Sequence, residues 1–279
     1  MDHIPTGTKC QGNKYSPGYV SPGRIVGGTE AVANSWPWMA SLFRNNNNLC
    51  GGSLISDEYV LTAAHCCPGF QTTLNNHGVS WRTVVHLGHH AQDDSPASPN
   101  RVVANILEVT IHPDYDASAQ ENDLCLIKIE KVTLNEDVDV VCLPDQGAHV
   151  AADDNNQNSG NHCLAAGWGF EDFDNGVKMN LLKSVQVKIY SDLWCTSQAA
   201  IQTSAFFAKD VEFCAGWLGT GGRDTCTFDS GGPLVCIEND EPVQYGITSW
   251  GSGCGEADNP GIYAEVAEFI RKGHFNYPS

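Results

Sequence analysis

The chain has 279 residues, which is enough to bury a large hydrophobic core in one or two domains. Its formal net charge of −18 comes from 33 acidic and 15 basic residues, so its surface should repel nucleic acids and anionic membranes. Only 17% of the residues are charged, while 28 are glycine and 13 are proline, a composition that favours many short strands joined by turns. We therefore expect a mostly β protein with neither a nucleic acid nor a membrane as a partner.

The first 23 residues are rich in glycine, proline and small polar residues, and this composition predicts an irregular leader. From Ile25 onward, short apolar segments recur between turn signals. Six of these segments predict strands: GGSLIS, YVLTAA, WRTVVHLG, DLCLIKI, LLKSVQVKIY and VQYGITSW. In the fifth segment, apolar residues alternate with Gln186 and Lys188, which is the period of a strand with one face in water.

The sequence predicts few helices and few long loops. Helical periodicity is weak and occurs only near SDLWCTSQAA and VAEFIRK. The polar stretch from Asp145 to Asn161 predicts a linker or a long surface loop between two halves of the chain. The run of asparagines from Asn45 to Asn48 predicts a loop tip. The adjacent His89 and His90 predict solvated surface, with a metal site as the open alternative.

The chain contains 12 cysteines, and their spacing lacks the repeated CxxC pairs of a zinc module. Disulfide bonds, and therefore an oxidising compartment, are the better interpretation. No apolar run has the length of a membrane span, and the start, MDHIPTGTKC, lacks the apolar core of a signal peptide. We therefore expect a secreted, extracellular protein whose secretion signal has been removed.

Three segments carry the residue types of nucleophilic catalysis: LTAAHCC around His65, ENDLCLIKI around Asp123 and TFDSGGP around Ser230. A serine hydroxyl is too weakly acidic to attack a peptide carbonyl unaided, so it needs a base that accepts its proton and later returns it. A carboxylate can hold an imidazole base in the useful tautomer. Each segment alone is a weak signal, because a histidine beside a cysteine is ordinary structure.

Taken together, in the order His, Asp, Ser, the three segments resemble those of the chymotrypsin-like serine peptidases. The resemblance also includes RIVGG, WPWMASL, CGGSLIS, AAGWG, SWG and NPGIYAEV, and it spans residues 24 to about 270. It implies an all-β fold of two packed antiparallel six-stranded β-barrels with a short C-terminal helix. It also implies a catalytic triad of His65, Asp123 and Ser230.

The resemblance divides the chain into an activation leader and a peptidase domain. The expected parts are the leader at 1–24, the first barrel at about 25–145, the second barrel at about 146–265 and a C-terminal segment at 266–279. Gly273 and Pro278 interrupt the place where the family usually continues its last helix. By the same resemblance, cleavage after Arg24 would free the amine of Ile25, which would fold inward and pair with Asp229. We therefore expect a zymogen.

The resemblance places the oxyanion hole at the backbone N–H groups of Ser230 and Phe228. The family has glycine where this chain has Phe228, and a bulky residue is disfavoured where φ must be positive. Phenylalanine keeps its N–H, so the donor is misplaced at worst and not deleted. We expect an altered oxyanion hole and, because the ring crowds the leaving-group side, resistance to protein inhibitors. A catalytically weak or inactive homologue that acts as a binding or regulatory protein is the alternative.

Asp224, six residues before Ser230, matches the residue at the base of the family's specificity pocket. A carboxylate at the bottom of a narrow apolar slot favours Arg or Lys before the cut. The other substrate-binding residues that the resemblance implies are Ser249, Trp250, Gly251 and Gly261. We expect protein and peptide substrates, protein inhibitors, a monomer, no cofactor and no metal. At the calcium loop of trypsins, His89 stands in place of the first carboxylate ligand, although Asp93 and Asp94 are nearby.

Five disulfide bonds are implied by the resemblance: Cys10–Cys142, Cys50–Cys66, Cys163–Cys236, Cys195–Cys214 and Cys226–Cys254. Two cysteines remain, each two residues after a triad residue: Cys67 follows His65, and Cys125 follows Asp123. Because the triad must bring these two segments together, we infer a sixth, less usual bond, Cys67–Cys125. Two buried free thiols are the alternative.

Overall fold

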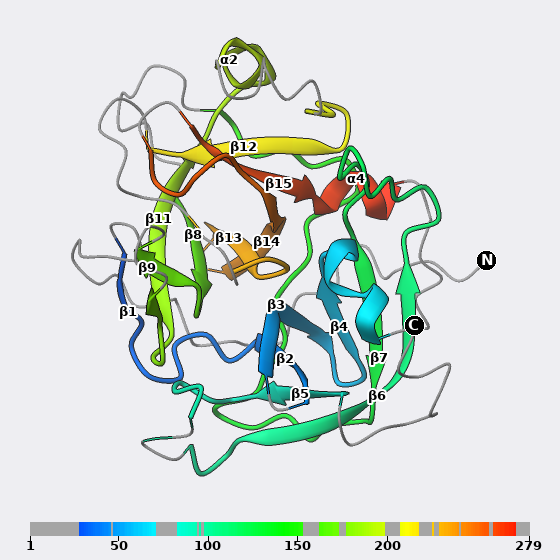
Figure 1. The fold of residues 1–279 in the computed structure, drawn as a ribbon, viewed down its shortest axis with the longest axis vertical. Coiled ribbons are helices and arrows are strands. Elements are labelled where there is room, and N and C mark those ends of the chain that lie inside the picture. The colour runs from blue at the N-terminus through cyan, green and yellow to red at the C-terminus, as the bar shows by residue number, and fades with distance from the viewer. Residues whose placement is uncertain are drawn as a thin grey trace.

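The computed structural model describes residues 28–45, 47–70, 83–93, 95, 98–152, 162–172, 177–198, 207–217, 225, 229–239, 241–256 and 259–271. Two antiparallel barrels make up this part of the chain, and Figure 1 shows their strands in the lower and upper halves of the view. The predicted fold class is confirmed. No helix within the described ranges is long and apolar enough to cross a membrane.

The first barrel closes in the order β2-β3-β4-β7-β6-β5. Its strands are β2 (Met39–Arg44), β3 (Asn47–Ser56), β4 (Tyr59–Thr62), β5 (Thr83–Leu87), β6 (Val102–Ile111) and β7 (Cys125–Ile129). The inward side chains pack into one core that includes Leu42, Leu54, Val85 and Ile127, all fully buried. Closure leaves no free strand edge, so this barrel is a rigid support for the loops at its rim.

The second barrel is built in the same way. Its strands are β8 (His162–Gly167), β11 (Lys183–Ile189), β12 (Glu212–Gly216), β13 (Pro233–Glu238), β14 (Glu241–Trp250) and β15 (Gly261–Glu265). The sheet order is β11-β12-β15-β14-β13-β8, and the pairing of β8 with β11 closes the ring. A two-stranded ribbon of β9 (Phe170–Asp172) and β10 (Val177–Lys178) lies outside it.

Both ends of the described chain cross to the other barrel. β1 (Thr29–Glu30) precedes the first barrel in sequence but pairs with β11 of the second. Helix α4 (Val266–Arg271) follows the second barrel, and its Phe269 is buried in the core of the first, beside His112. A separate cluster that includes Trp36, Trp38 and Trp168 packs residues of both barrels together. These contacts hold the two barrels in one arrangement.

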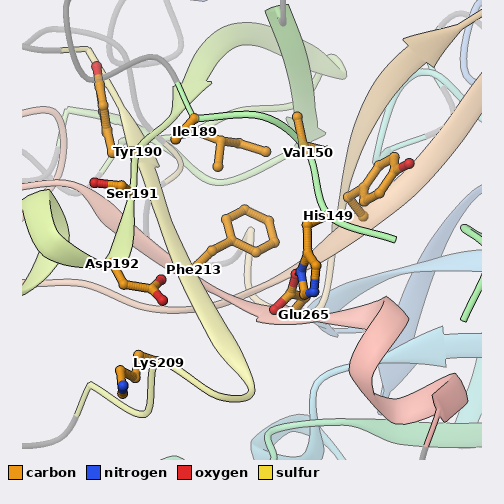
Figure 2. A pocket seen from close by; sticks show the side chains of 11 residues that line it. His149, Val150, Ile189, Tyr190, Ser191, Asp192, Lys209, Phe213 and Glu265 are labelled. Atoms are coloured by element: carbon orange, nitrogen blue, oxygen red, sulfur yellow. The ribbon is translucent and has the colours of Figure 1, made fainter. Parts of the chain in front are cut away.

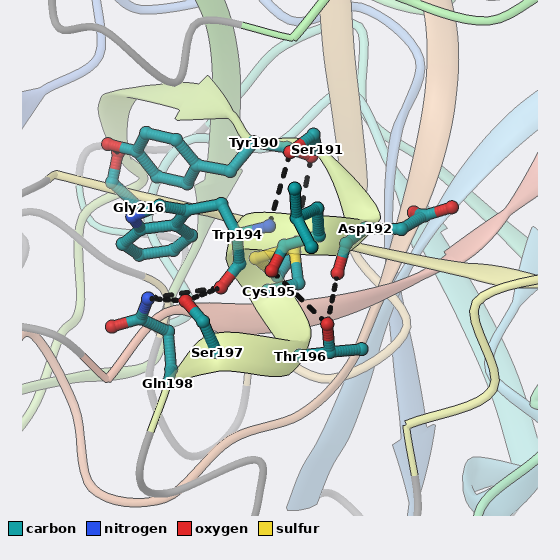
Figure 3. Close-up of a disulfide and its surroundings, with 11 residues drawn as sticks. Tyr190, Ser191, Asp192, Trp194, Cys195, Thr196, Ser197, Gln198 and Gly216 are labelled. Carbon is teal, nitrogen blue, oxygen red and sulfur yellow. Dashed lines mark hydrogen bonds between the residues drawn. A yellow bond between two sulfur atoms is a disulfide. The ribbon is translucent and has the colours of Figure 1, made fainter.

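All six segments that the sequence predicted as strands contain a strand, namely β3, β4, β5, β7, β11 and β14. The two weak helical signals correspond to α4 and to α2 (Asp192–Ser197). Figure 3 shows α2, whose first turn is capped by Ser191: its hydroxyl accepts a hydrogen bond from the Trp194 N–H at 3.2 Å. The disulfide Cys195–Cys214 ties this helix to β12.

The prediction that one face of β11 lies in water is wrong at Lys188, which is only 1% exposed. β11 lies between β8 and β12, where Lys188 pairs with His162 and Gly216. Its Nζ lies 5.1 Å from the centroid of the Trp217 ring, so the charge rests on an aromatic face instead of in solvent. Residues distant in sequence therefore cover a face that the local pattern indicated as polar.

The prediction that His89 and His90 are solvated surface is also wrong, because both are buried. The His89 ring stacks on Trp168 with the ring centroids 4.8 Å apart. His90 Nε2 lies 3.1 Å from Glu30 Oε1, and the His90 carbonyl accepts hydrogen bonds from the Trp168 indole and from the Leu182 N–H. This segment leaves β5 and pairs with the residues that lead into β11, so it is enclosed between the two barrels.

Candidate active site

His65 and Asp123 are brought together by two neighbouring strands. His65 lies in a short 3₁₀ turn, η1 (Ala64–Cys66), directly after β4, and Asp123 lies two residues before β7. Because β4 pairs with β7, with Thr62 opposite Cys125, both residues emerge at the same end of the first barrel. His65 Nδ1 lies 2.7 Å from Asp123 Oδ2, and the His65 backbone N–H donates to Asp123 Oδ1 at 2.8 Å.

Asp123 is 1% exposed and accepts a third hydrogen bond, from the Ser249 hydroxyl to Oδ2 at 2.5 Å. Three donors on one carboxylate fix its orientation. The carboxylate in turn assigns the proton of the His65 ring to Nδ1, which leaves Nε2 as the acceptor. The sequence placed Ser249 among the substrate-binding residues, and its contact with Asp123 was not predicted.

Ser230 lies in a turn just before β13, at the junction of the two barrels. Its carbonyl accepts a hydrogen bond from the Gly51 N–H at 2.8 Å and lies 3.8 Å from Cys66 Sγ, next to His65. Gly231 has a φ of 81°, and a side chain there would collide with Thr62 and the Gly51 carbonyl, so glycine is required for this close approach. Within the described residues no hydrogen bond joins His65 Nε2 to the Ser230 hydroxyl. In serine hydrolases without a bound substrate, the distance between these two atoms is often too long for a hydrogen bond.

Of the predicted pocket walls, Gly251 directly follows β14 and Gly261 opens β15, and these two strands pair with each other. Gly251 and Gly261 lie side by side, because a methyl group on Gly251 would be 3.8 Å from the Gly261 Cα. The hydroxyl of Thr225 lies 3.1 Å from that of Tyr263 on β15. Asp224, the residue before Thr225 and the predicted base of the pocket, lies outside the described residues, as does Phe228 of the predicted oxyanion hole.

Asp229, the predicted partner of the freed amine, is 1% exposed. Its Oδ1 accepts a hydrogen bond from the Gly169 N–H at 2.7 Å. A buried carboxylate requires such partners, because an ion transferred from water loses its hydration. Arg24 and Ile25 lie outside the described residues.

Four of the six expected disulfide bonds are present between described residues: Cys50–Cys66, Cys67–Cys125, Cys163–Cys236 and Cys195–Cys214. Cys142 and Cys254 are also disulfide-bonded, whereas Cys10 and Cys226 lie outside the described residues. The Cys67–Cys125 bond links the segment of His65 to that of Asp123, with a Cα–Cα separation of 6.7 Å. This bond closes a long loop and therefore restricts how far the two segments can separate.

Few described side chains near His65, Asp123 and Ser230 could together bind a metal ion. Among the described side chains, Cys50, His65 and Cys66 form the one group of potential ligands that lie close together. The two cysteines of this group are joined in a disulfide, so they offer no thiolate.

A cavity of about 330 Å³ lies on the second barrel, apart from His65, Asp123 and Ser230. Figure 2 shows the His149 ring beside Glu265, with the Phe213 ring to their left. His149 Nδ1 lies 2.6 Å from Glu265 Oε1, and this contact raises the pKa of His149. Burial raises the pKa of Glu265 and that of Asp192, which also lines the cavity.

Comparison with known proteins agrees with this geometry. The family model described as trypsin matches residues 25–272. Human transmembrane protease serine 5 is 34% identical over 248 residues, which cover 88% of this chain and 50% of that protein. Human serine protease 56 is 34% identical over 251 residues, which cover 88% of this chain and 38% of that protein. The chain therefore spans half or less of the length of these relatives, and it belongs to the trypsin family of serine proteases.

Proposed function

We propose that the chain is a serine endopeptidase that cleaves after Arg or Lys and is made as a zymogen. The observation that supports this proposal most directly is the 2.7 Å contact between His65 Nδ1 and Asp123 Oδ2, beside the turn that holds Ser230. Labelling by a fluorophosphonate, which reacts with an activated serine hydroxyl, tests this proposal. After cleavage at Arg24, the chain should be labelled at Ser230, whereas an inactive binding homologue would stay unlabelled.

The proposed reaction has two halves. The Ser230 oxygen forms a bond to the substrate carbonyl carbon, the electron pair of the C=O bond moves to its oxygen, and the proton passes to His65 Nε2. The tetrahedral intermediate then collapses, the C–N bond breaks, and His65 returns the proton to the leaving amine. Water repeats both steps on the acyl ester and regenerates Ser230. Asp123 stabilises the imidazolium that forms in each half.

Specificity for Arg or Lys rests on Asp224. Replacement of Asp224 by serine should lower kcat/KM for Arg and Lys reporter peptides by about 10³-fold, because the buried substrate charge loses its partner. Fluorophosphonate labelling of Ser230 should persist, and this serves as the control for a folded site. Retained preference for Arg and Lys in Asp224→Ser would rule out this assignment.

Phe228 sets how well the developing oxyanion is bound in the proposed enzyme. Loss of one oxyanion-hole donor typically lowers turnover about 10²–10³-fold, so a misplaced Phe228 N–H should cost part of that range. Phe228→Gly should therefore raise kcat by up to about 10²-fold and speed the binding of protein inhibitors. The measurements are steady-state kinetics and inhibitor association rates for the processed chain. An unchanged kcat together with an unchanged association rate would contradict this role.

Activation would follow cleavage after Arg24. The buried Asp229 carboxylate, which already accepts the Gly169 N–H, would gain the Ile25 ammonium as an ionic partner. Because Asp229 is the neighbour of Ser230, its orientation would affect the backbone N–H of Ser230 directly. This is the proposed link between processing and formation of the oxyanion hole.

We propose that the enzyme acts outside the cell as a monomer. All ten cysteines of the described residues are disulfide-bonded, which supports an oxidising compartment. One relative is named a transmembrane protease and is about twice as long as the matched region, so a membrane-attached longer protein is the second candidate. Fractionation of cells that express the full natural protein distinguishes the two, because the enzyme should be found in the medium or in the membranes.

A further inference from the structure

Glu212, the first residue of β12, is a buried acid that sequence reasoning did not identify. It is only 1% exposed. Its Oε1 accepts a hydrogen bond from the Trp250 indole N–H at 3.1 Å, and its Oε2 accepts one from the Ala208 backbone N–H at 2.8 Å. Within the described residues it forms no ion pair. Both oxygens of this carboxylate are therefore held by neutral N–H donors.

Trp250, the partner of Glu212, is the last residue of β14 and one of the predicted substrate-binding residues. The register between β14 and β15 shifts between Thr248 and Trp250, so the strand pairing there is irregular. Two side-chain hydrogen bonds hold the end of β14. The Ser249 hydroxyl donates to Asp123, and the Trp250 indole N–H donates to Glu212. The Trp250 ring also packs against the cluster that contains Cys214 and Ile262, and the Glu212 carboxylate is the partner that fixes the direction of its indole N–H.

The charged groups around Glu212 all disfavour its ionisation. Burial raises the pKa of Glu212 to about 7, the hydrogen bonds from Ala208 and Trp250 lower it in part, and the charges of Asp123 and Glu121 raise it further. The ordinary value is 4.5, so the folded protein binds this proton more tightly than the unfolded chain does. Folding stability should therefore decrease as pH rises from about 4.5 to about 7 and level off above that range.

The two protonation states of Glu212 differ in what they can accept. An ionised carboxylate accepts both N–H groups, whereas a protonated one carries an O–H donor on one oxygen. That O–H would face one of two N–H donors, and the hydrogen bond there would weaken. Glutamine imitates this state permanently, because its amide has a single oxygen and its NH₂ group would also face a donor.

We propose that Glu212 is a positioning residue that holds the Trp250 indole against the substrate cleft and makes peptide binding depend on pH near neutrality. This inference rests on the proposed peptidase function. Ionised Glu212 fixes the indole and gives the lower KM. Protonation of Glu212 releases the indole and raises KM, while kcat stays the same because Glu212 takes no part in the proposed proton transfer.

The kinetic test compares the processed wild-type chain with Glu212→Gln on an Arg reporter peptide between pH 5.5 and 8.5. In the wild type, KM should fall about tenfold as pH rises through about 7, the ratio expected for one charge-assisted hydrogen bond. In Glu212→Gln, KM should stay at the value that the wild type shows at low pH over the whole range. The dependence of kcat on pH should be the same in the two proteins. Glu265→Gln is the matched control, because Glu265 lies on the adjacent strand but pairs with His149, and it should behave as the wild type. If KM of Glu212→Gln changed with pH as it does in the wild type, the proposal would be overturned.

A second readout does not need activity. The chain has seven tryptophans, and the Trp250 indole N–H resonance can be assigned by its loss in Trp250→Phe. In the uncleaved wild-type chain this resonance should titrate with a midpoint near 7, and in Glu212→Gln it should not. A resonance that stays fixed from pH 5.5 to 8.5 overturns the role of Glu212 whatever the activity. If the resonance titrates but no peptide is cleaved, the proposed function fails and the indole contact stands.

Discussion

Ser230→Ala should lower kcat for peptide hydrolysis by roughly 10⁶-fold, the size of effect seen when a triad nucleophile is removed. The loss follows because the proposed mechanism depends on deprotonation of the Ser230 hydroxyl by His65. The measurement is kcat of the processed chain with an Arg reporter peptide, together with loss of fluorophosphonate labelling.

The stability of Ser230→Ala provides its control. Within the described residues the Ser230 hydroxyl forms no hydrogen bond, so the midpoint of thermal unfolding should not change. A variant that folds normally and keeps kcat within about 10²-fold of the wild type would contradict the assignment of Ser230 as nucleophile, because that loss is too small for removal of a nucleophile.

Asp123→Asn should lower kcat by about 10⁴-fold, as loss of the triad carboxylate does in well-studied members of this class. Asp123 Oδ1 accepts the His65 backbone N–H, so the asparagine oxygen should take that place and leave its NH₂ group opposite the imidazole. Nδ1 must then accept a hydrogen bond, and the ring proton moves to Nε2. In that tautomer His65 cannot take the proton of Ser230.

Asp116→Asn is the matched control for this prediction. Asp116 is seven residues away, and its carboxylate, whose pKa is lowered chiefly by the Ser118 hydroxyl and backbone N–H, makes no contact with the triad in its described hydrogen bonds. The kcat of Asp116→Asn should equal that of the wild type. If Asp123→Asn kept activity within tenfold of the control, Asp123 would not be the residue that orients His65.

Local sequence patterns predicted the elements whose environment is set by neighbours in the chain. The apolar segments of β3, β4, β5, β7, β11 and β14 were identified because each carries its own turn signals and buried residues. β6 was not among the six predicted strands, and its polar residues interrupt the apolar run along its ten residues. His65, Asp123 and Ser230 were singled out because their three segments, in this order, resemble those of one peptidase family.

Residues whose burial depends on distant segments could not be predicted. His89 is covered by Trp168, 79 positions later, and Lys188 is covered by Trp217. Glu212 looks like an ordinary surface acid until Trp250 of another strand donates to it. In each case a polar residue is buried because its partner arrives through the tertiary fold, which local periodicity does not describe.

The pairing of β1 with β11 limits where the new N-terminus can go. Thr29 is held opposite Ser184, and the Ala31 N–H donates to the Leu182 carbonyl at 2.9 Å, so the chain is anchored from residue 29 onward. Four residues separate this anchor from the proposed cut, and a fully extended tether of that length spans at most about 14 Å. The ammonium group that the proposed cleavage would release is thereby confined to a small volume, where its effective concentration would be high and little translational freedom would remain to be lost.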